Sequence, residues 1–530
     1  MARNRYSFLV KLPTAIALIA AADQLFLGTA IGSWIGALAL GWILALLLSR
    51  PALRRRPSLV ALAVAAGFTG VLAHAPSLLG WVLFWSALSI AALMPRIGRF
   101  DDAWRWGLRL LAHAMTGPLA PLLDGIRLFR ARPRRGRPSS SGLAALLVLP
   151  LAMTGLFLAL FASANPLIAR GLTQVSLPSS FSVIFWALVL LVVWPSLRPT
   201  RWATRIVARM PSADIELPGL PQATLLLSLI LFNAVFALQN GLDLAFLWSG
   251  AALPEGVTLA DYAHRGAYPL IATALLAGLF VLVALKPGSA SAANPAIRRL
   301  VVLWVAQNLL LVASSILRTL DYVEAYSLTG FRIAALAWMG LVAIGLVLIC
   351  WRMLAGRSAA WLINANALMA ALALGAASVV DLDASAAAWN VRHAREVGGR
   401  GVELDLCYLS WTGPSSLLSL IELERRPLPP RFRDRVRYVR AEVLETLVRR
   451  QADWRSWTWR NQRRLDTARR LLGANPPAPA ATWPGTHREC DGWIRDDPAP
   501  EPAPSVTSES DPVANAVATT TPPLTGTPSR

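Results

Sequence analysis

The chain has 530 residues, of which 55% are hydrophobic and only 15% are charged, and its mean hydropathy is +0.49. A net charge of +21 in a soluble protein would indicate a nucleic-acid partner, but here the arginines lie in loops between long apolar stretches. The composition therefore excludes an ordinary soluble domain. It predicts a membrane protein whose first partner is the lipid bilayer, with no nucleic acid and no cofactor expected.

Apolar stretches recur from Leu12 to about Val380, and about 18 such residues are enough to cross the hydrocarbon core. Every second connection is rich in arginine, as the positive-inside rule requires, so we expect a cytoplasmic N-terminus. An odd number of spans would then place the C-terminal region outside. The predicted fold class is an all-α polytopic helix bundle of about eleven spans: 12–28, 31–49, 58–74, 77–94, 142–162, 181–197, 221–247, 267–285, 299–317, 332–351 and 359–380.

This pattern divides the chain into five predicted regions. They are a four-span membrane region (1–100), a basic cytoplasmic loop (101–141), a seven-span membrane region (142–382), a small helical extracytoplasmic region (383–474) and a disordered tail (475–530). Within the helical region, apolar residues at helical spacing predict a buried stripe that comprises Phe432, Val436, Val439, Val443 and Leu447.

The basic loop contains a predicted amphipathic helix that lies in the headgroup layer. Asp101 and Asp102 can cap its start, and Arg105, Arg109 and His113 follow on one face. The opposite face is apolar and consists of Trp104, Leu108, Leu111 and Met115. Two interpretations remain open, namely a sensor of anionic lipid and a plain interfacial connector.

Glycines repeat at every fourth position near the start of the second span, at Gly28, Gly32 and Gly36. On a helix they would share one face, where the lack of side chains lets a neighbouring helix approach closely. We expect packing inside this protein from this strip. Dimerisation is the alternative.

No familiar catalytic motif is present in the sequence: there is no P-loop, HExxH, GxSxG or Rossmann glycine pattern. Cys350, Cys407 and Cys490 lie far apart without a CxxC pair, which predicts neither a disulfide framework nor a cysteine metal site. The five histidines are isolated from one another, so no metal site is expected.

Polar side chains inside predicted spans are costly in the bilayer and each needs a reason. Because the first, seventh and ninth spans run in the same direction, these residues are expected to line a polar pocket open to the outside, with Arg318 near Asp243 or Asp321. The alternative is interhelical hydrogen bonding that only fixes packing. The candidates are Asp23, Asn233, Gln239, Asn240, Asp243, Gln307, Asn308, Arg318 and Asp321.

The segments 232–250, 253–271 and 297–352 resemble a bacterial multi-pass membrane family called domain of unknown function 4173, and 402–423 resembles its post-membrane segment more loosely. The resemblance implies an inner-membrane location and brings no established activity. It also draws attention to Arg265 and Tyr322 as further pocket candidates.

Three classes of function remain. The favoured class is a non-catalytic binding, sensing or assembly component with a small-molecule or lipid ligand, because no catalytic motif is present. A transporter of a small solute would need a path through the bundle. An envelope enzyme acting on a lipid-linked substrate would need a carboxylate at an outer cavity, for which only Asp243, Asp321 and Glu324 qualify.

Overall fold

The computed structural model describes residues 2–130, most of 150–165, 178–208, 221–246, 248, 273, 276, 280 and 294–496. The described chain is almost entirely helical, which confirms the all-α class. Within it, seven helices are long and apolar enough to cross a membrane: α3 (Arg56–His74), α4 (Leu78–Ile97), α9 (Ser180–Leu197), α11 (Gln222–Phe246), α14 (Pro295–Tyr326), α15 (Gly330–Leu354) and α16 (Ala359–Val379).

Two further helices, α1 (Ala2–Phe26) and α2 (Trp34–Ser49), coincide with the first two predicted spans, and a short 3₁₀ helix, η1 (Pro51–Arg54), follows α2. The predicted spans 142–162 and 267–285 lie largely outside the described residues.

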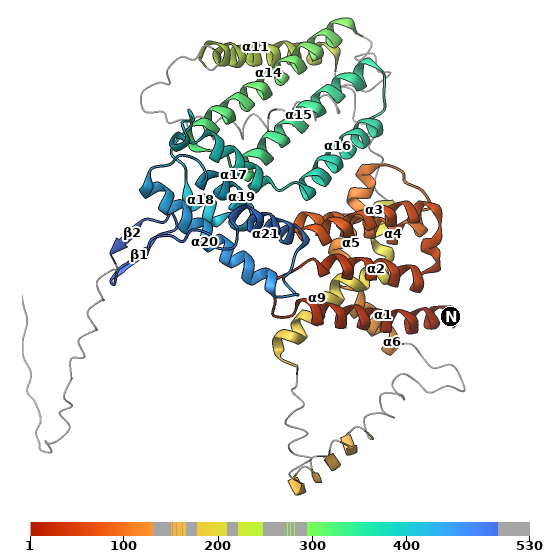
Figure 1. Ribbon diagram of the computed structural model, residues 1–530. Helices are drawn as coiled ribbons and strands as arrows, with labels where there is room; N and C mark the ends of the chain where they lie inside the picture. Colours follow the sequence, from red (N-terminus) through yellow and green to blue (C-terminus); the bar gives the residue numbers. More distant parts are fainter. Residues whose placement is uncertain are drawn as a thin grey trace, which may run out of the picture.

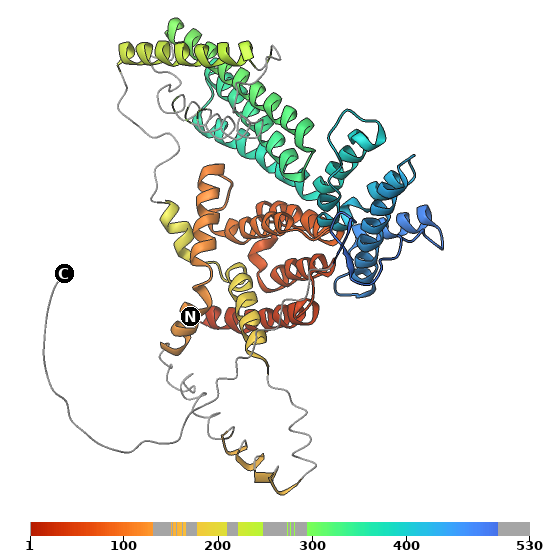
Figure 2. The same cartoon turned by 90° about the vertical axis from the view of Figure 1, so that its left-hand side faces the viewer.

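The membrane helices form two bundles (Figure 1). The first bundle consists of α1 to α4 and α9, and its core contains Trp42 and Phe84, whose rings lie 5.9 Å apart. The second bundle consists of α11 and α14 to α16, and Trp304 stacks on Phe232 in its core. Figure 2 shows the two bundles beside each other with α11 far from α1. The second bundle meets the first where α16 lies against α4, and Asn364 of α16 accepts a hydrogen bond from the Ala103 amide beyond the end of α4.

Arginines at one end of the first bundle bind the carbonyl ends of its helices. The Arg50 guanidinium donates to Ser196 O at 2.6 Å and to Ala92 O at 2.9 Å, and Arg96 donates to Thr200 O at 2.8 Å. Ser196 lies in the last turn of α9, where the carbonyls lack helical partners and carry partial negative charge, which a cation satisfies. Burial, with nearby Arg96, lowers the pKa of Arg50 to about 10, so Arg50 stays charged at neutral pH.

Three amphipathic helices surround the same end of the first bundle: α5 (Ala103–Thr116), α6 (Ala120–Arg130) and α10 (Arg201–Ala208). Asp102 accepts from the Arg105 amide and caps α5, as predicted. The predicted apolar face points outward, since Trp104 and Met115 are 50% and 70% exposed. This arrangement suits a helix whose apolar face lies among lipid headgroups.

The basic face of α5 is turned toward the protein and is not free for lipid. Arg109 is buried and donates two hydrogen bonds of 2.6 Å to the Asp101 carboxylate. Burial alone would raise the pKa of Asp101, but the bonds from Arg109 outweigh it and hold that pKa below its ordinary value. Burial, with Arg96 and Arg50 nearby, lowers the pKa of His113 to about 4. These internal contacts favour the interfacial connector over the lipid sensor.

The C-terminal domain, residues 382–496, is a compact group of short helices. Its elements are α17 (Leu382–His393), η2 (Arg395–Val397), α18 (Leu406–Trp411), η3 (Gly413–Ser416), α19 (Leu417–Glu424), α20 (Pro430–Ala452), α21 (Trp459–Leu472), β1 (Thr486–Arg488) and β2 (Ile494–Asp496). The predicted apolar stripe of α20 is buried throughout, which confirms the helical periodicity.

Two predictions about this region were wrong. Residues 475–496, predicted to belong to the disordered tail, are part of the domain, with β1 and β2 paired antiparallel so that His487 faces Arg495. Cys407 and Cys490 form a disulfide with a Cα–Cα distance of 4.9 Å. The pairing could not be predicted across a sequence separation of 83 residues, because only the folded chain brings the β1–β2 hairpin, which carries Cys490, next to Cys407 in α18. Residues 497–530 of the predicted tail lie outside the described residues.

The C-terminal domain lies against both bundles (Figures 1 and 2). At the first bundle, the Ser33 amide donates to Trp457 O at 2.8 Å and Trp34 Nε1 donates to Trp454 O at 2.7 Å. At the second bundle, Leu328 exchanges two backbone bonds with the Asn390 side chain, at 2.7 and 2.8 Å. Ser33, Trp34 and Leu328 lie at the ends of helices that the charge pattern assigns to the outer side of the membrane, and all three contact the C-terminal domain. The arginine-rich connections around Arg50 and Thr200 lie at the opposite end of the first bundle.

One glycine of the predicted strip permits close helix packing. A Cβ on Gly36 would lie 2.6 Å from Ala73 Cβ and 2.7 Å from Thr69 O, so α2 approaches α3 at this point. Gly28 and Gly32 precede α2, which begins at Trp34, so they do not extend the helical face. The expected packing inside the protein therefore holds for Gly36.

We expect Gly36→Ala to lower the free energy of unfolding by about 1–3 kcal/mol, the usual cost of forcing an extra carbon into a packed contact. Gly41→Ala is the matched control, because nothing lies within 4 Å of a Cβ at that position of the same helix. Thermal unfolding of the purified protein in detergent measures both. Equal effects at the two positions would contradict the packing role of Gly36.

Candidate functional site

The strongest concentration of buried polar side chains lies between α11 and α14 in the second bundle. We define the α11–α14 polar cluster as Asn233, Gln239, Asn240, Asp243, Gln307, Ser314 and Arg318. Two neighbouring helices supply it because polar residues recur along one face of each. The structure thus brings together most of the polar side chains that the sequence placed in the seventh and ninth predicted spans.

An ion pair forms the charged end of the cluster. The Arg318 guanidinium donates to Asp243 Oδ1, and the two side chains are only 8% and 3% exposed. Gln239 Nε2 donates to the same carboxylate oxygen at 3.0 Å. Of the two carboxylates considered for Arg318, the structure therefore selects Asp243, while Asp321 is exposed. A buried pair with added hydrogen bonds is the form in which the membrane interior tolerates charge.

Amide side chains extend the cluster along the two helices. Gln307 Nε2 donates to Asn233 Oδ1 at 3.2 Å, and Asn233 Nδ2 donates to Leu300 O at 3.1 Å. Asn240 Nδ2 donates to the backbone oxygen of Gln307 at 3.2 Å. These contacts cross from α11 to α14 and hold the two helices in register, which is the packing role expected of polar groups in a bundle.

Three side-chain oxygens of the α11–α14 polar cluster accept no hydrogen bond from the other members of the cluster. Asn240 Oδ1, Asp243 Oδ2 and Gln307 Oε1 are buried and have no hydrogen-bond partner among the residues that the structure describes. The NH2 groups of Asn240 and Gln307 and the Oδ1 atom of Asp243 make the internal bonds, whereas the two amide oxygens and Asp243 Oδ2 remain unused. A buried acceptor without a partner costs about 1–3 kcal/mol, so three in one cluster exceed what packing requires.

The remaining predicted site residues lie elsewhere. Asp23 accepts a 2.7 Å bond from Trp186 Nε1 in the first bundle, so it does not converge with Asp243 as expected. Shared direction and depth do not bring two helices together, and α1 and α11 belong to different bundles (Figure 2). Asn308 is buried and donates to Trp304 O within its own helix. Arg265 lies outside the described residues.

Tyr322 belongs to an aromatic group at the end of α14. Its ring centre lies 4.8 Å from that of Tyr326, and the Arg332 guanidinium lies 4.3 Å above the ring. This cation–π contact joins α14 to α15 and leaves Tyr322 in the helix connection rather than in the cluster.

One contact of the cluster was missed from sequence. Trp248 Nε1 donates to Ser314 Oγ at 3.2 Å, so a tryptophan just beyond α11 reaches the cluster near the ion pair. A tryptophan near a span end is commonly an anchor at the membrane–water interface, and periodicity cannot show that its N–H turns inward. Among the described residues, no three His, Cys, Asp or Glu side chains are placed to hold a metal ion.

Comparison with known proteins identifies one family. A family model described as a domain of unknown function, DUF4153, matches residues 59–423. It is a different family from the domain of unknown function 4173 that the segments within 232–352 resemble, so that specific expectation is corrected. No curated protein and no solved structure matches the chain.

Proposed function

We propose that this chain, which belongs to the DUF4153 family, is a non-catalytic binding or sensing component of the bacterial inner membrane. The observation that carries the proposal is the set of three unpartnered oxygens in the α11–α14 polar cluster. They favour a small solute that donates hydrogen bonds, such as an ammonium ion or a hydroxyl compound. An anion is disfavoured, because the oxygens present lone pairs and Arg318 is already neutralised by Asp243.

The proposed orientation places the N-terminus in the cytoplasm and the C-terminal domain in the periplasm. Two features support it. Arg50 and Arg96 bind backbone carbonyls at one end of the first bundle, whereas Ser33 and Trp34 at its other end bind the C-terminal domain. The Cys407–Cys490 disulfide suits an oxidising compartment. With Asp243 and Arg318 near the ends of α11 and α14 that point outward in this topology, the solute would arrive from the periplasm.

A ligand-dependent stability measurement tests the binding role. We expect methylammonium or glycerol, but not acetate, to raise the midpoint of thermal unfolding of the detergent-purified protein at constant ionic strength. A ligand at one hundred times its Kd stabilises by about 2.7 kcal/mol. We expect Gln307→Leu to remove this stabilisation, because it deletes one of the three free oxygens.

Asn308→Leu is the matched control, since Asn308 is a buried amide on the adjacent position that donates within α14. It should keep the response to the probes. If neither methylammonium nor glycerol stabilises the wild type, or if both variants respond alike, the cluster serves helix packing alone and the proposed function is rejected.

A further inference from the structure

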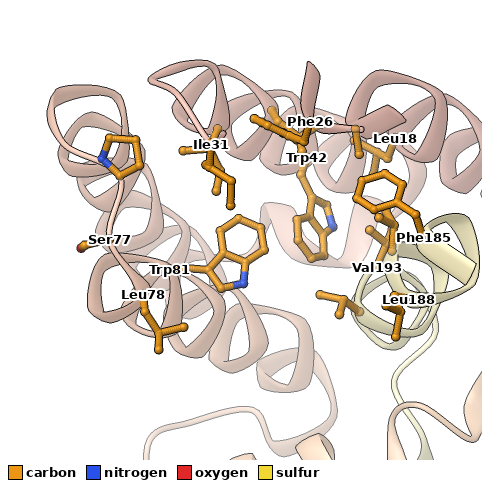
Figure 3. A pocket seen from close by; sticks show the side chains of 16 residues that line it. Leu18, Phe26, Ile31, Trp42, Ser77, Leu78, Trp81, Phe185, Leu188 and Val193 are labelled. Atoms are coloured by element: carbon orange, nitrogen blue, oxygen red, sulfur yellow. The ribbon is translucent and has the colours of Figure 1, made fainter. Parts of the chain in front are cut away.

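A second site lies in the first bundle, away from the α11–α14 polar cluster. A cavity of about 500 Å³, which we call the lateral cavity, lies between α1, α2, α4 and α9. Figure 3 shows the side chains that line it. Its walls are apolar and aromatic, and they include Leu18, Trp42, Leu78, Trp81, Leu188 and Val193. The rings of Trp42 and Trp81 lie 6.1 Å apart and line one wall. A small polar solute would gain nothing from these walls.

The depth of the lateral cavity corresponds to one leaflet of the bilayer. Its lining extends over the nine residues from Phe185 to Val193 on α9, a rise of about 12 Å. It has the same length on α1, from Leu18 to Phe26. Half of the hydrocarbon core is about 15 Å thick. One end of the cavity is formed by Ile31 and Ser77. These residues lie in connections at the end of the first bundle that meets the C-terminal domain, and we call this end of the cavity its upper end.

The lateral cavity opens sideways toward lipid. Leu188 and Val192 of α9 line it and are 57% and 38% exposed, although they lie within a membrane helix. Side chains exposed at this depth face hydrocarbon. A lipid chain can therefore enter between α4 and α9 without passing through water.

The lateral cavity has apolar walls along about 12 Å and a volume of about 500 Å³. One hydrocarbon chain is narrow enough, and burial of each methylene in place of water or a void is favourable.

The upper end offers contacts for a phosphate. The rings of Trp34 and Trp454 meet edge to face at 5.8 Å, and the Arg455 guanidinium lies 5.4 Å from the centre of the Trp454 ring. Tryptophans mark the membrane–water interface, and a guanidinium binds phosphate oxygens through paired N–H groups. The backbone of Arg455 also contacts the loop beside Ile31, since a Cβ on Gly32 would collide with Arg455 O.

We propose that the lateral cavity binds one hydrocarbon chain of a membrane lipid whose phosphate headgroup lies at the Trp34–Trp454–Arg455 end. The site is independent of the α11–α14 polar cluster. It would tie the C-terminal domain to a lipid of the same leaflet.

Photo-crosslinking with a lipid probe tests the proposal. The full-length protein is reconstituted in vesicles of phosphatidylcholine with phosphatidylglycerol that carries a diazirine on its acyl chain. We expect the label on α9 and α4 peptides that line the lateral cavity. Leu38→Trp, which fills the cavity, should lower this labelling about tenfold, the change expected when about two methylenes lose their burial.

Leu44→Trp is the matched control, because Leu44 lies on the same helix, is 52% exposed and does not line the cavity. It should leave the labelling unchanged. Equal labelling in the two variants, at matched thermal stability, would overturn the proposal. Label confined to positions outside the cavity would do the same.

The headgroup is tested with a diazirine diacylglycerol, which has the chains without the phosphate. Phosphatidylglycerol should label the wild type more strongly, and Arg455→Gln should abolish this difference. Inorganic phosphate should not compete with the lipid. Equal labelling by the two lipids, or competition by inorganic phosphate, would overturn the assignment of a lipid phosphate to Arg455.

Discussion

Replacement of Arg318 by glutamine is expected to lower the free energy of unfolding by roughly 3–5 kcal/mol, because it leaves the Asp243 carboxylate buried without its cation. The two side chains are 8% and 3% exposed, so water cannot replace the lost partner. Asp243→Asn should cost a similar amount. The measurement is chemical or thermal unfolding of the detergent-purified variants.

The double variant Asp243→Asn/Arg318→Gln separates the ion pair from general disruption. It should be more stable than either single variant, since no unpaired charge remains. Arg449→Gln is the control for removal of an exposed partner, because the Arg449–Glu445 pair is about 70% exposed on both sides. It should cost less than about 1 kcal/mol. A loss that small for Arg318→Gln would show that Asp243 and Arg318 do not form a buried pair.

Loss of the Cys407–Cys490 disulfide is expected to destabilise the C-terminal domain by about 4 kcal/mol. The bond closes a loop across 83 residues, and the chain entropy that it removes from the unfolded state increases with loop length. Cys490→Ser should therefore make residues 382–496 of the full-length protein sensitive to trypsin and fast in amide hydrogen exchange. Cys350→Ser is the control, since Cys350 is free and lies in α15.

The same bond reports the compartment of the C-terminal domain in intact cells. The chain has three cysteines and one of them is free. After denaturation in the presence of a polymer-linked maleimide, we expect one adduct without prior reduction and three adducts after it. Three adducts under both conditions would place the domain in a reducing compartment and contradict the proposed topology.

The parts of the fold that follow from local periodicity were predictable. The stripe from Phe432 to Leu447 is buried because residues at a period of 3.6 share one helix face wherever the helix packs. A contact of Arg318 with Asp243 or Asp321 was expected from span direction and depth, and the structure contains the one with Asp243. Both inferences used distances along a helix, which sequence spacing determines.

The parts that depend on which elements become neighbours were not predictable from one sequence. Asp23 and Asp243 have equivalent depths, yet the bundle in which each helix lies separates them. Cys490 reaches Cys407 only because the 486–496 hairpin folds back on the domain. Amphipathicity predicted helix α5, but it did not predict that the Arg109 guanidinium would be hydrogen-bonded to the Asp101 carboxylate. The lateral cavity is likewise a gap among four helices that no pattern in any one of them encodes.

The double contact of Arg50 has a consequence for the order in which the protein assembles in the membrane. Its acceptors are Ala92 O, 42 residues later in the chain, and Ser196 O, 146 residues later. Both carbonyls are synthesised after α2, so Arg50 cannot form these two hydrogen bonds while α2 enters the bilayer. Until α4 and α9 are in place, the guanidinium has to be solvated by water. Arg50 thus joins α2 to α4 and α9, and we expect its loss to impair the late assembly of the first bundle.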